Sequence, residues 1–280
     1  MKQALAYVPP FWMVALRFGL SIPFLGLAIV LSQRRLPKFH RADAPVVFGV
    51  GLLQFAGQMT LVTLALQTVN ASTATLLIYS TPVWLLMIDL IIARNKVSLG
   101  RMGLVALSLA GCIFIVWQGA DGAAGLGYAQ IILAAVFWSI SIRLIGSHRW
   151  KGAVLDALFW QALLATSICT PTALLFEGAL DMTVLDAPAL WYLLYVGPLA
   201  TAGGFGLMVF AGRHVAPPLV ALSSTAAPLI GVATAAAILG ETLSSAIWIG
   251  GGLMLLSLFL GAGPLSALRK FRSARHASQD

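Results

Sequence analysis

The sequence predicts an all-α integral membrane protein with nine transmembrane helices arranged as two inverted repeats. Hydrophobic residues make up 60% of the 280 residues and charged residues only 9%, whereas an ordinary soluble domain has about 25% charged residues. The apolar residues gather in nine stretches of roughly 20 residues, which is the length a helix needs to cross a hydrocarbon core. The short alternating segments of a β-barrel are not seen. A third observation, an internal repeat, orders these stretches into two halves.

The nine predicted spans are joined by short connections, as is typical of antiparallel helices packed in one bundle. No soluble domain or long linker separates them, and residues 264–280 form a polar, basic tail. The spans are residues 9–32, 45–68, 71–93, 99–118, 127–146, 153–176, 187–211, 216–239 and 245–263.

The repeat is clearest around two prolines. Pro82 lies inside the apolar stretch that begins at Asn70, and Pro228 lies at the same place in a second stretch that begins at Ala216. The two prolines are 146 residues apart, and a polar junction follows each of them after the same interval. A period of this size in a chain of 280 residues indicates two related halves.

The first repeat, residues 1–118, holds four spans, and the second, residues 127–263, holds five. The extra span, residues 127–146, has no counterpart before Pro9, and the simplest explanation is that a first helix is missing. Because a repeat of five spans is odd, its two copies have opposite orientations. Inverted repeats of this kind are typical of secondary transporters.

Positive charges set the orientation, because lysine and arginine concentrate in cytoplasmic loops. One set of loops and the C-terminal tail hold 15 of the 17 basic residues, and the alternate loops carry only acidic ones. We therefore expect a cytoplasmic C-terminus and, with nine spans, an external Met1. The net charge of +8 flanks the membrane in this way, so it does not indicate nucleic acid as a partner.

Four stretches resemble the drug/metabolite transporter superfamily, and within it the EamA-type carriers. They are PPFWMVALRF at 9–18, ALQTVNASTATLLIYSTPVW at 65–84, AAVFWSISIR at 134–143 and APLIGVATAAAILGETLS at 227–244. The resemblance implies a bundle of two five-helix inverted repeats in the bacterial inner membrane, with this chain beginning at the second helix. It also implies export of small metabolites such as amino acids. The chain departs from the family at Asn95, where the glutamate seen at Glu241 usually recurs.

The two prolines are candidate substrate-site residues. Each lacks an N–H and so frees the carbonyl four residues earlier, at Ile78 and at Ser224. One interpretation is that two kinked helices line a substrate site and offer acceptors, Ser224 among them, to an ammonium group. The alternative is that neighbouring hydroxyls take up the freed carbonyls and the kinks serve packing alone.

Polar and aromatic side chains inside the spans complete the candidate substrate site. Gln54 and Gln58 are one helical turn apart and share a face, so they either contact substrate or hydrogen-bond to another helix. Arg17 is the only cation well inside a span, and such a charge is costly there. It can bind a substrate carboxylate, bridge carbonyls at helix ends, or pair with an acid outside this chain. Aromatic walls are expected from Tyr79, Trp138 and Trp160, or these rings serve ordinary packing.

Glu241 stands at a junction on the outer side, where it either stabilises the turn or acts as an outer gate. The glycines at 250–252 allow close helix packing within the bundle or in a homodimer. Cys112 and Cys169 lie singly in apolar spans, so we expect buried free thiols and no metal pair.

Enzyme classes fit the sequence poorly. No GxxxxGK[ST] motif is present, so ATP hydrolysis on this chain does not drive transport. The membrane spans offer neither a histidine nor a second deep carboxylate for a catalytic pair. The histidines lie in loops on the basic side or in the tail, at positions 40, 148, 214 and 276. We expect no catalytic residue and no cofactor.

The function predicted from the sequence is a secondary carrier that exports small metabolites such as amino acids by alternating access, with one half rocking against the other about a central site. Efflux of cationic drugs is the alternative within transport, and the lack of a deep carboxylate counts against it. A structural or receptor role is the remaining alternative. The expected partners are a small-molecule substrate and the lipid bilayer.

Overall fold

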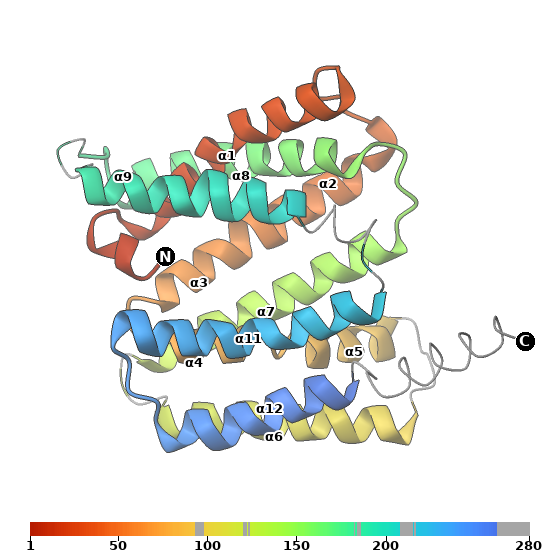
Figure 1. The fold of residues 1–280 in the computed structure, drawn as a ribbon, viewed down its shortest axis with the longest axis vertical. Coiled ribbons are helices and arrows are strands. Elements are labelled where there is room, and N and C mark those ends of the chain that lie inside the picture. The colour runs from red at the N-terminus through yellow and green to blue at the C-terminus, as the bar shows by residue number, and fades with distance from the viewer. Residues whose placement is uncertain are drawn as a thin grey trace, which may run out of the picture. The chain divides into compact units, whose positions relative to one another are not determined.

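The computed structural model describes residues 1–92, 98–119, 122, 124–181, 183, 186–207, 215 and 217–261, with the side chains of 92 and 217–225 left out. Across these residues the chain is all-α (Figure 1), which confirms the predicted fold class. Seven helices are long and apolar enough to cross a membrane, and two shorter apolar helices lie in the last two predicted spans.

The helices follow the predicted spans closely, with several of them divided by changes in helix type. In chain order they are η1 (Gln3–Ala6), α1 (Pro10–Gln33), η2 (Arg41–Asp43), α2 (Ala44–Val50), η3 (Gly51–Gln58), α3 (Met59–Ala65), α4 (Ala71–Ile78), α5 (Thr81–Ile92), α6 (Leu99–Gly119), α7 (Ala124–Ser147), α8 (Val154–Phe176), α9 (Ala187–Leu194), η5 (Tyr195–Gly203), α11 (Pro217–Leu239) and α12 (Ser245–Gly261).

The helices gather into two compact units, which are not the two sequence repeats. Unit 1 comprises Met1–Val69 and Leu126–Val209, and unit 2 comprises Asn70–Gly125 and Phe210–Asp280. Each unit therefore combines helices from the first half of the chain with helices from the second half. The two units are described separately below.

Unit 1 is built around α1, which packs against α8 and η5 (Figure 1). Its core is apolar and contains the fully buried Phe18, Phe55 and Leu25. The free thiol of Cys169 is buried in this core, and that of Cys112 is buried in unit 2, as predicted. Gly197 lets η5 approach α1 closely, because a Cβ at this position would lie 2.9 Å from the carbonyl oxygen of Arg17.

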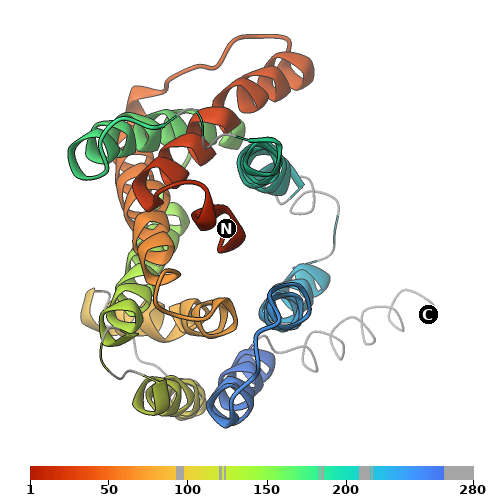
Figure 2. The same ribbon diagram turned by 90° about the vertical axis from the view of Figure 1, so that its left-hand side faces the viewer.

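Unit 2 contains a close pair of helices, α6 and α12, which run side by side (Figure 2). A Cβ at Gly250 would lie 2.6 Å from the carbonyl oxygen of Gly111, and a Cβ at Gly111 would collide with the carbonyl of Gly250. The hydroxyl of Ser257 donates to the carbonyl oxygen of Leu104 at 2.7 Å. Packing inside the unit thus accounts for Gly250, while the homodimer stays a prediction.

Two predicted kinks differ from each other. The stretch after Asn70 is broken between α4 and α5, just before Pro82, and the hydroxyl of Thr81 donates to the carbonyl of Ile78 at 2.6 Å. The alternative in which a neighbouring hydroxyl takes up the freed carbonyl is therefore what the structure shows at Pro82. α11 instead continues through Pro228, which is buried.

Replacing either glycine of the close pair tests the α6–α12 packing. We expect Gly111→Ala or Gly250→Ala to destabilise the protein by about 1–3 kcal/mol, because the added methyl group would overlap a backbone carbonyl. Gly252→Ala is the control, because a Cβ at Gly252 meets nothing within 4 Å. It should leave the unfolding temperature in detergent unchanged or raise it slightly. Equal losses in all three variants would show that the close approach is not needed.

Candidate functional site in unit 1

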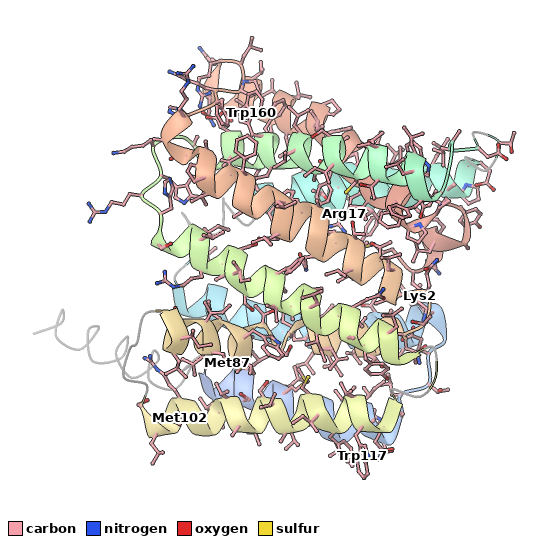
Figure 3. All side chains as sticks on the ribbon, turned by 180° about the vertical axis from the view of Figure 1, so that it is seen from behind. Lys2, Arg17, Met87, Met102, Trp117 and Trp160 are labelled. Carbon is pink, nitrogen blue, oxygen red and sulfur yellow. The ribbon has the colours of Figure 1, made fainter. Side chains whose placement is uncertain are left out.

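Arg17 lies inside unit 1 (Figure 3), between α1, η5 and the end of η3. Its Nε donates to the hydroxyl oxygen of Thr201 at 2.9 Å. Its Nη1 contacts the sulfur atoms of Met1, at 3.0 Å, and Met59, at 3.4 Å. The guanidinium also lies 5.7 Å from the ring centroid of Phe18. Residues far apart in the sequence thus converge on one cation.

The partners of Arg17 are weak for a group of this kind. An arginine has five N–H donors, and a thioether sulfur is a poor acceptor. Among the described residues, no carboxylate lies within ion-pair distance of Arg17, and the N–H groups of Nη2 have no partner. A cation inside a membrane span normally has a counter-charge or faces a wet cavity. The guanidinium can therefore accept a bidentate anion.

Thr201 links this cation to an unusual stretch of helix. η5 is a π-helix, and the buried Thr201 hydroxyl donates to the carbonyl of Val196, five residues earlier, while it accepts from Arg17. η3 is a second π-helix at the corresponding place in the other repeat. Short π-helical segments inside α-helices occur frequently at functional sites. Sequence patterns carry no signal that separates them from α-helix, so neither π-helix was predicted.

A stack of aromatic rings lies beside the cation. The ring centroids of Phe18 and Phe55 are 5.0 Å apart, and Phe55 stacks on Phe205 with centroids 5.5 Å apart and planes 11° from parallel. These separations are typical of favourable ring pairs. The three rings join α1, η3 and the segment just after η5 by apolar contact, next to the guanidinium of Arg17.

The two predicted glutamines lie in η3, directly before Met59. Gln58 is buried and Gln54 is partly buried. The amide oxygens of both are buried and have no hydrogen-bond partner among the described residues. The structure therefore brings both glutamines into the same unit as Arg17, and it does not show the helix–helix hydrogen bond that was the alternative for them.

Trp160 lies elsewhere in unit 1. Its ring contacts Phe39 in the loop after α1, with centroids 5.3 Å apart, and Figure 3 places it at the opposite end of the helices from Lys2. It lines a small pocket among the loops at that end of unit 1, and no contact joins it to Arg17 among the described residues. Trp138 is partly buried on α7 of the same unit.

The remaining predicted site residues belong to unit 2. Tyr79 is partly buried at the break between α4 and α5, and Pro82 next to it is exposed. Pro228 is buried within α11. The side chain of Ser224 lies outside the described residues.

Two glutamates each hold the start of a helix from the other repeat. The carboxylate of Glu241 accepts from the backbone N–H groups of Ala71 and Ser72, at 2.7 and 2.9 Å, and from the Ser72 hydroxyl. In unit 1 the carboxylate of Glu177 accepts from the N–H groups of Phe11 and Trp12, at 2.9 and 3.0 Å. A helix start has unpaired N–H groups and favours negative charge. Both glutamates therefore cap the start of a helix. For Glu241 these contacts correspond to the stabilising role, one of the two roles predicted from the sequence. No role was predicted for Glu177.

The loops at the other end of unit 1 are joined by two buried aspartates. Asp43 accepts from His148 at 2.8 Å and from the N–H group of Gly152 at 2.7 Å. Asp156 accepts from Arg35 at 2.6 Å and from the N–H group of Lys38. The hydrogen bond to Asp156 raises the pKa of the Arg35 guanidinium. These contacts pin the loop after α1 to the start of α8.

A very small pocket of about 10 Å³ lies among these loop-end residues. Phe39, Asp43, Asp156 and Trp160 are among the residues that line it. Across the described part of the chain, no group of three or more histidine, cysteine or acidic residues is placed to hold a metal ion. The contacts of Asp43 and Asp156 link the loops to one another.

The helices define a polytopic membrane protein, and the comparisons with known proteins show that it is a transporter. The chain belongs to the EamA-like transporter family, which it matches over residues 1–117 and 125–262. It is a transporter and not an enzyme.

Two bacterial relatives carry functional names. The chain is 26% identical over 270 residues to a protein of Salmonella typhimurium named "Probable amino-acid metabolite efflux pump", with 92% of this chain and 87% of the relative covered. A protein of Escherichia coli with the same name is 24% identical over the same share of both chains. A protein of known crystal structure shares the fold, with a TM-score of 0.66, 18% identity and coverage of 96% of this chain and 92% of the other.

Removing a capping carboxylate tests its structural role. We expect Glu241→Ala and Glu177→Ala each to lower the free energy of unfolding by about 0.5–2 kcal/mol, because the first N–H groups of α4 or α1 lose their acceptor. The unfolding temperature of the purified protein in detergent measures this. Among the described residues, the exposed Asp181 accepts hydrogen bonds from Thr183 of its own loop alone, so Asp181→Ala should change the unfolding temperature much less. A Glu241→Ala protein with unchanged unfolding temperature would remove the capping role.

Proposed function

We propose that this chain is a secondary carrier that exports amino acids or closely related small metabolites across the bacterial inner membrane by alternating access. The observation that carries the proposal is Arg17, a cation inside unit 1 whose described partners are a hydroxyl and two thioethers. The names of the two bacterial relatives support this substrate class.

In this proposal Arg17 binds the carboxylate of the substrate. Its Nη2 donors are unpaired among the described residues, and a carboxylate accepts two parallel N–H bonds from one guanidinium. Such a bond to a charged group is worth about 1.5–3 kcal/mol. Thr201 then acts as a positioning residue, because its hydroxyl fixes Nε and leaves the other edge of the guanidinium for the ligand.

Alternating access is supported by the two repeats and by the paired π-helices. Inverted repeats allow two related conformations in which the same site opens to opposite sides. Glu241 would act as an outer gate if the capping contacts at the start of α4 break during transport. The other predicted substrate contacts stay proposals: Trp138 and Trp160 in unit 1, and Tyr79, Pro82, Ser224 and Pro228 in unit 2.

Efflux of cationic compounds is the second function considered within transport. A cationic substrate at this place would meet the like charge of Arg17, and no carboxylate is described beside it to offset the repulsion. The geometry therefore favours a substrate with a carboxylate over a simple cation.

Variants of Arg17 and Thr201 test the proposed site. In proteoliposomes loaded with radiolabelled amino acids, we expect Arg17→Ala to reduce saturable transport at least tenfold, because the carboxylate loses its partner. Arg17→Lys should retain part of the activity, since it keeps the charge but not the bidentate geometry. Thr201→Val should lower the apparent affinity, and Thr201→Ser should restore it. Full activity of both Arg17→Ala and Thr201→Val would remove the site from the mechanism.

The proposed orientation has its own test. We expect a green fluorescent protein fused after Asp280 to fluoresce, and an alkaline phosphatase fused there to be inactive, because the basic loops place the C-terminus in the cytoplasm. Phosphatase fused after Gly178, next to the acidic loop, should be active. The reverse pattern would invert the proposed direction of every span.

A further inference from the structure

Two amide oxygens in η3 lack the partners that buried acceptors normally have. Gln58 is only 3% exposed, and its Oε1 is buried with no hydrogen-bond partner in the part of the chain that the structure describes. The Oε1 of Gln54 is buried and unpaired as well. An acceptor left without a donor away from water is destabilising, and buried polar groups in native proteins are mostly paired. The two oxygens therefore mark a place where a donor is missing.

The two amides do not satisfy each other. Residues four apart share a face of a helix, and glutamine amides at this spacing are able to hydrogen-bond, yet both oxygens are unpaired. One external group with several N–H donors can bond to both oxygens. An ammonium group has three such donors and no acceptor, so its chemistry matches this pair.

One of the two glutamines, Gln58, is adjacent in sequence to a residue that contacts Arg17. Met59 directly follows Gln58, and its sulfur is 3.4 Å from Nη1 of Arg17. Consecutive Cα atoms are about 3.8 Å apart. The amide oxygen of Gln58, which can accept from a cationic group, and the contact to the Arg17 guanidinium, which can donate to an anionic group, therefore come from neighbouring positions of unit 1. An α-amino acid carries these two groups on one carbon atom.

We propose that Gln54 and Gln58 bind the ammonium group of an α-amino acid whose carboxylate is held by Arg17. This inference rests on the proposed function and adds a selectivity: the site prefers the amino acid to the matching 2-oxo acid. Amide oxygens suit this task beside an arginine. A neutral amide oxygen accepts from the ammonium and, unlike a carboxylate, forms no ion pair with a guanidinium, so it leaves Arg17 for the substrate.

The 2-oxo acid provides the discriminating probe. It keeps the carboxylate and the side chain of the amino acid but has a carbonyl oxygen in place of the ammonium group. That oxygen donates nothing, so the glutamine oxygens would stay unpaired and face another acceptor. Sites built to hydrogen-bond a group strongly reject analogues that lack it.

The experiment uses the full chain in proteoliposomes, with radiolabelled L-leucine, L-valine and L-phenylalanine as substrates. The 2-oxo acid of each is the inhibitor, and the readout is the ratio of its inhibition constant to the apparent KM of the amino acid. We expect this ratio to be well above ten in the wild-type protein and to fall at least tenfold in Gln58→Leu, which corresponds to about 1.4 kcal/mol. Arg17→Ala should weaken both ligands and leave the ratio nearly unchanged.

Gln161 supplies the matched control. It is as buried as Gln58 and lies on α8, but none of its amide atoms is both fully buried and unpaired. Gln161→Leu should therefore leave the ratio unchanged. If Gln58→Leu does not fold, Gln54→Leu is read in its place, with the same expected fall.

The outcomes separate this inference from the proposed function. Absence of saturable transport of all three amino acids by the wild-type protein would overturn the proposed substrate class. Transport that persists, with a ratio unchanged in Gln58→Leu or lowered equally in Gln161→Leu, would overturn the ammonium site alone. A fall confined to the η3 variants supports it.

Discussion

The lack of water in the hydrocarbon core is the constraint on which the rest of this structure depends. Each backbone group that a helix leaves unpaired there needs a partner from the protein. Thr81 supplies a donor where Pro82 frees a carbonyl, and Glu241 supplies an acceptor where α4 begins. Among the described residues, the Nη2 donors of Arg17 and the amide oxygens of Gln54 and Gln58 lack such partners, as does the buried Nε1 of Trp160.

Much of this arrangement is readable in the sequence, and the limits of that reading have physical causes. Length and hydropathy locate the spans, because the thickness of the bilayer fixes how many apolar residues a helix needs. Arg17 is readable as a site because a charge among apolar residues is costly. The sequence does not show which side-chain atoms are in contact in the folded protein. Trp160 is as apolar and as deep in its span as a site residue would be, yet it packs on Phe39 of a loop.

The same limit applies to pairs that are distant in the chain. Nothing local to Glu177 indicates that it caps a helix start more than 160 residues earlier, and only the position of an acid directly after an apolar span, before a glycine with positive φ, hints at a role. The π-helices escape prediction for another reason, since their residues differ little from those of ordinary helices. Their recurrence at matching places, roughly 145 residues apart, became visible only with the backbone.

The composition of the two compact units has a consequence for biogenesis. Because each unit takes helices from both halves of the chain, no unit is complete when the ribosome has translated only the first half. The start of α1 lacks its capping carboxylate until Glu177 has been synthesised. The start of α4 lacks its own until Glu241, which is synthesised 170 residues after Ala71. The early helices therefore lack part of their final packing partners while they reside in the lipid or in the insertion machinery, until the late helices emerge. Assembly of this protein is then a docking step between finished helices, and it follows membrane insertion.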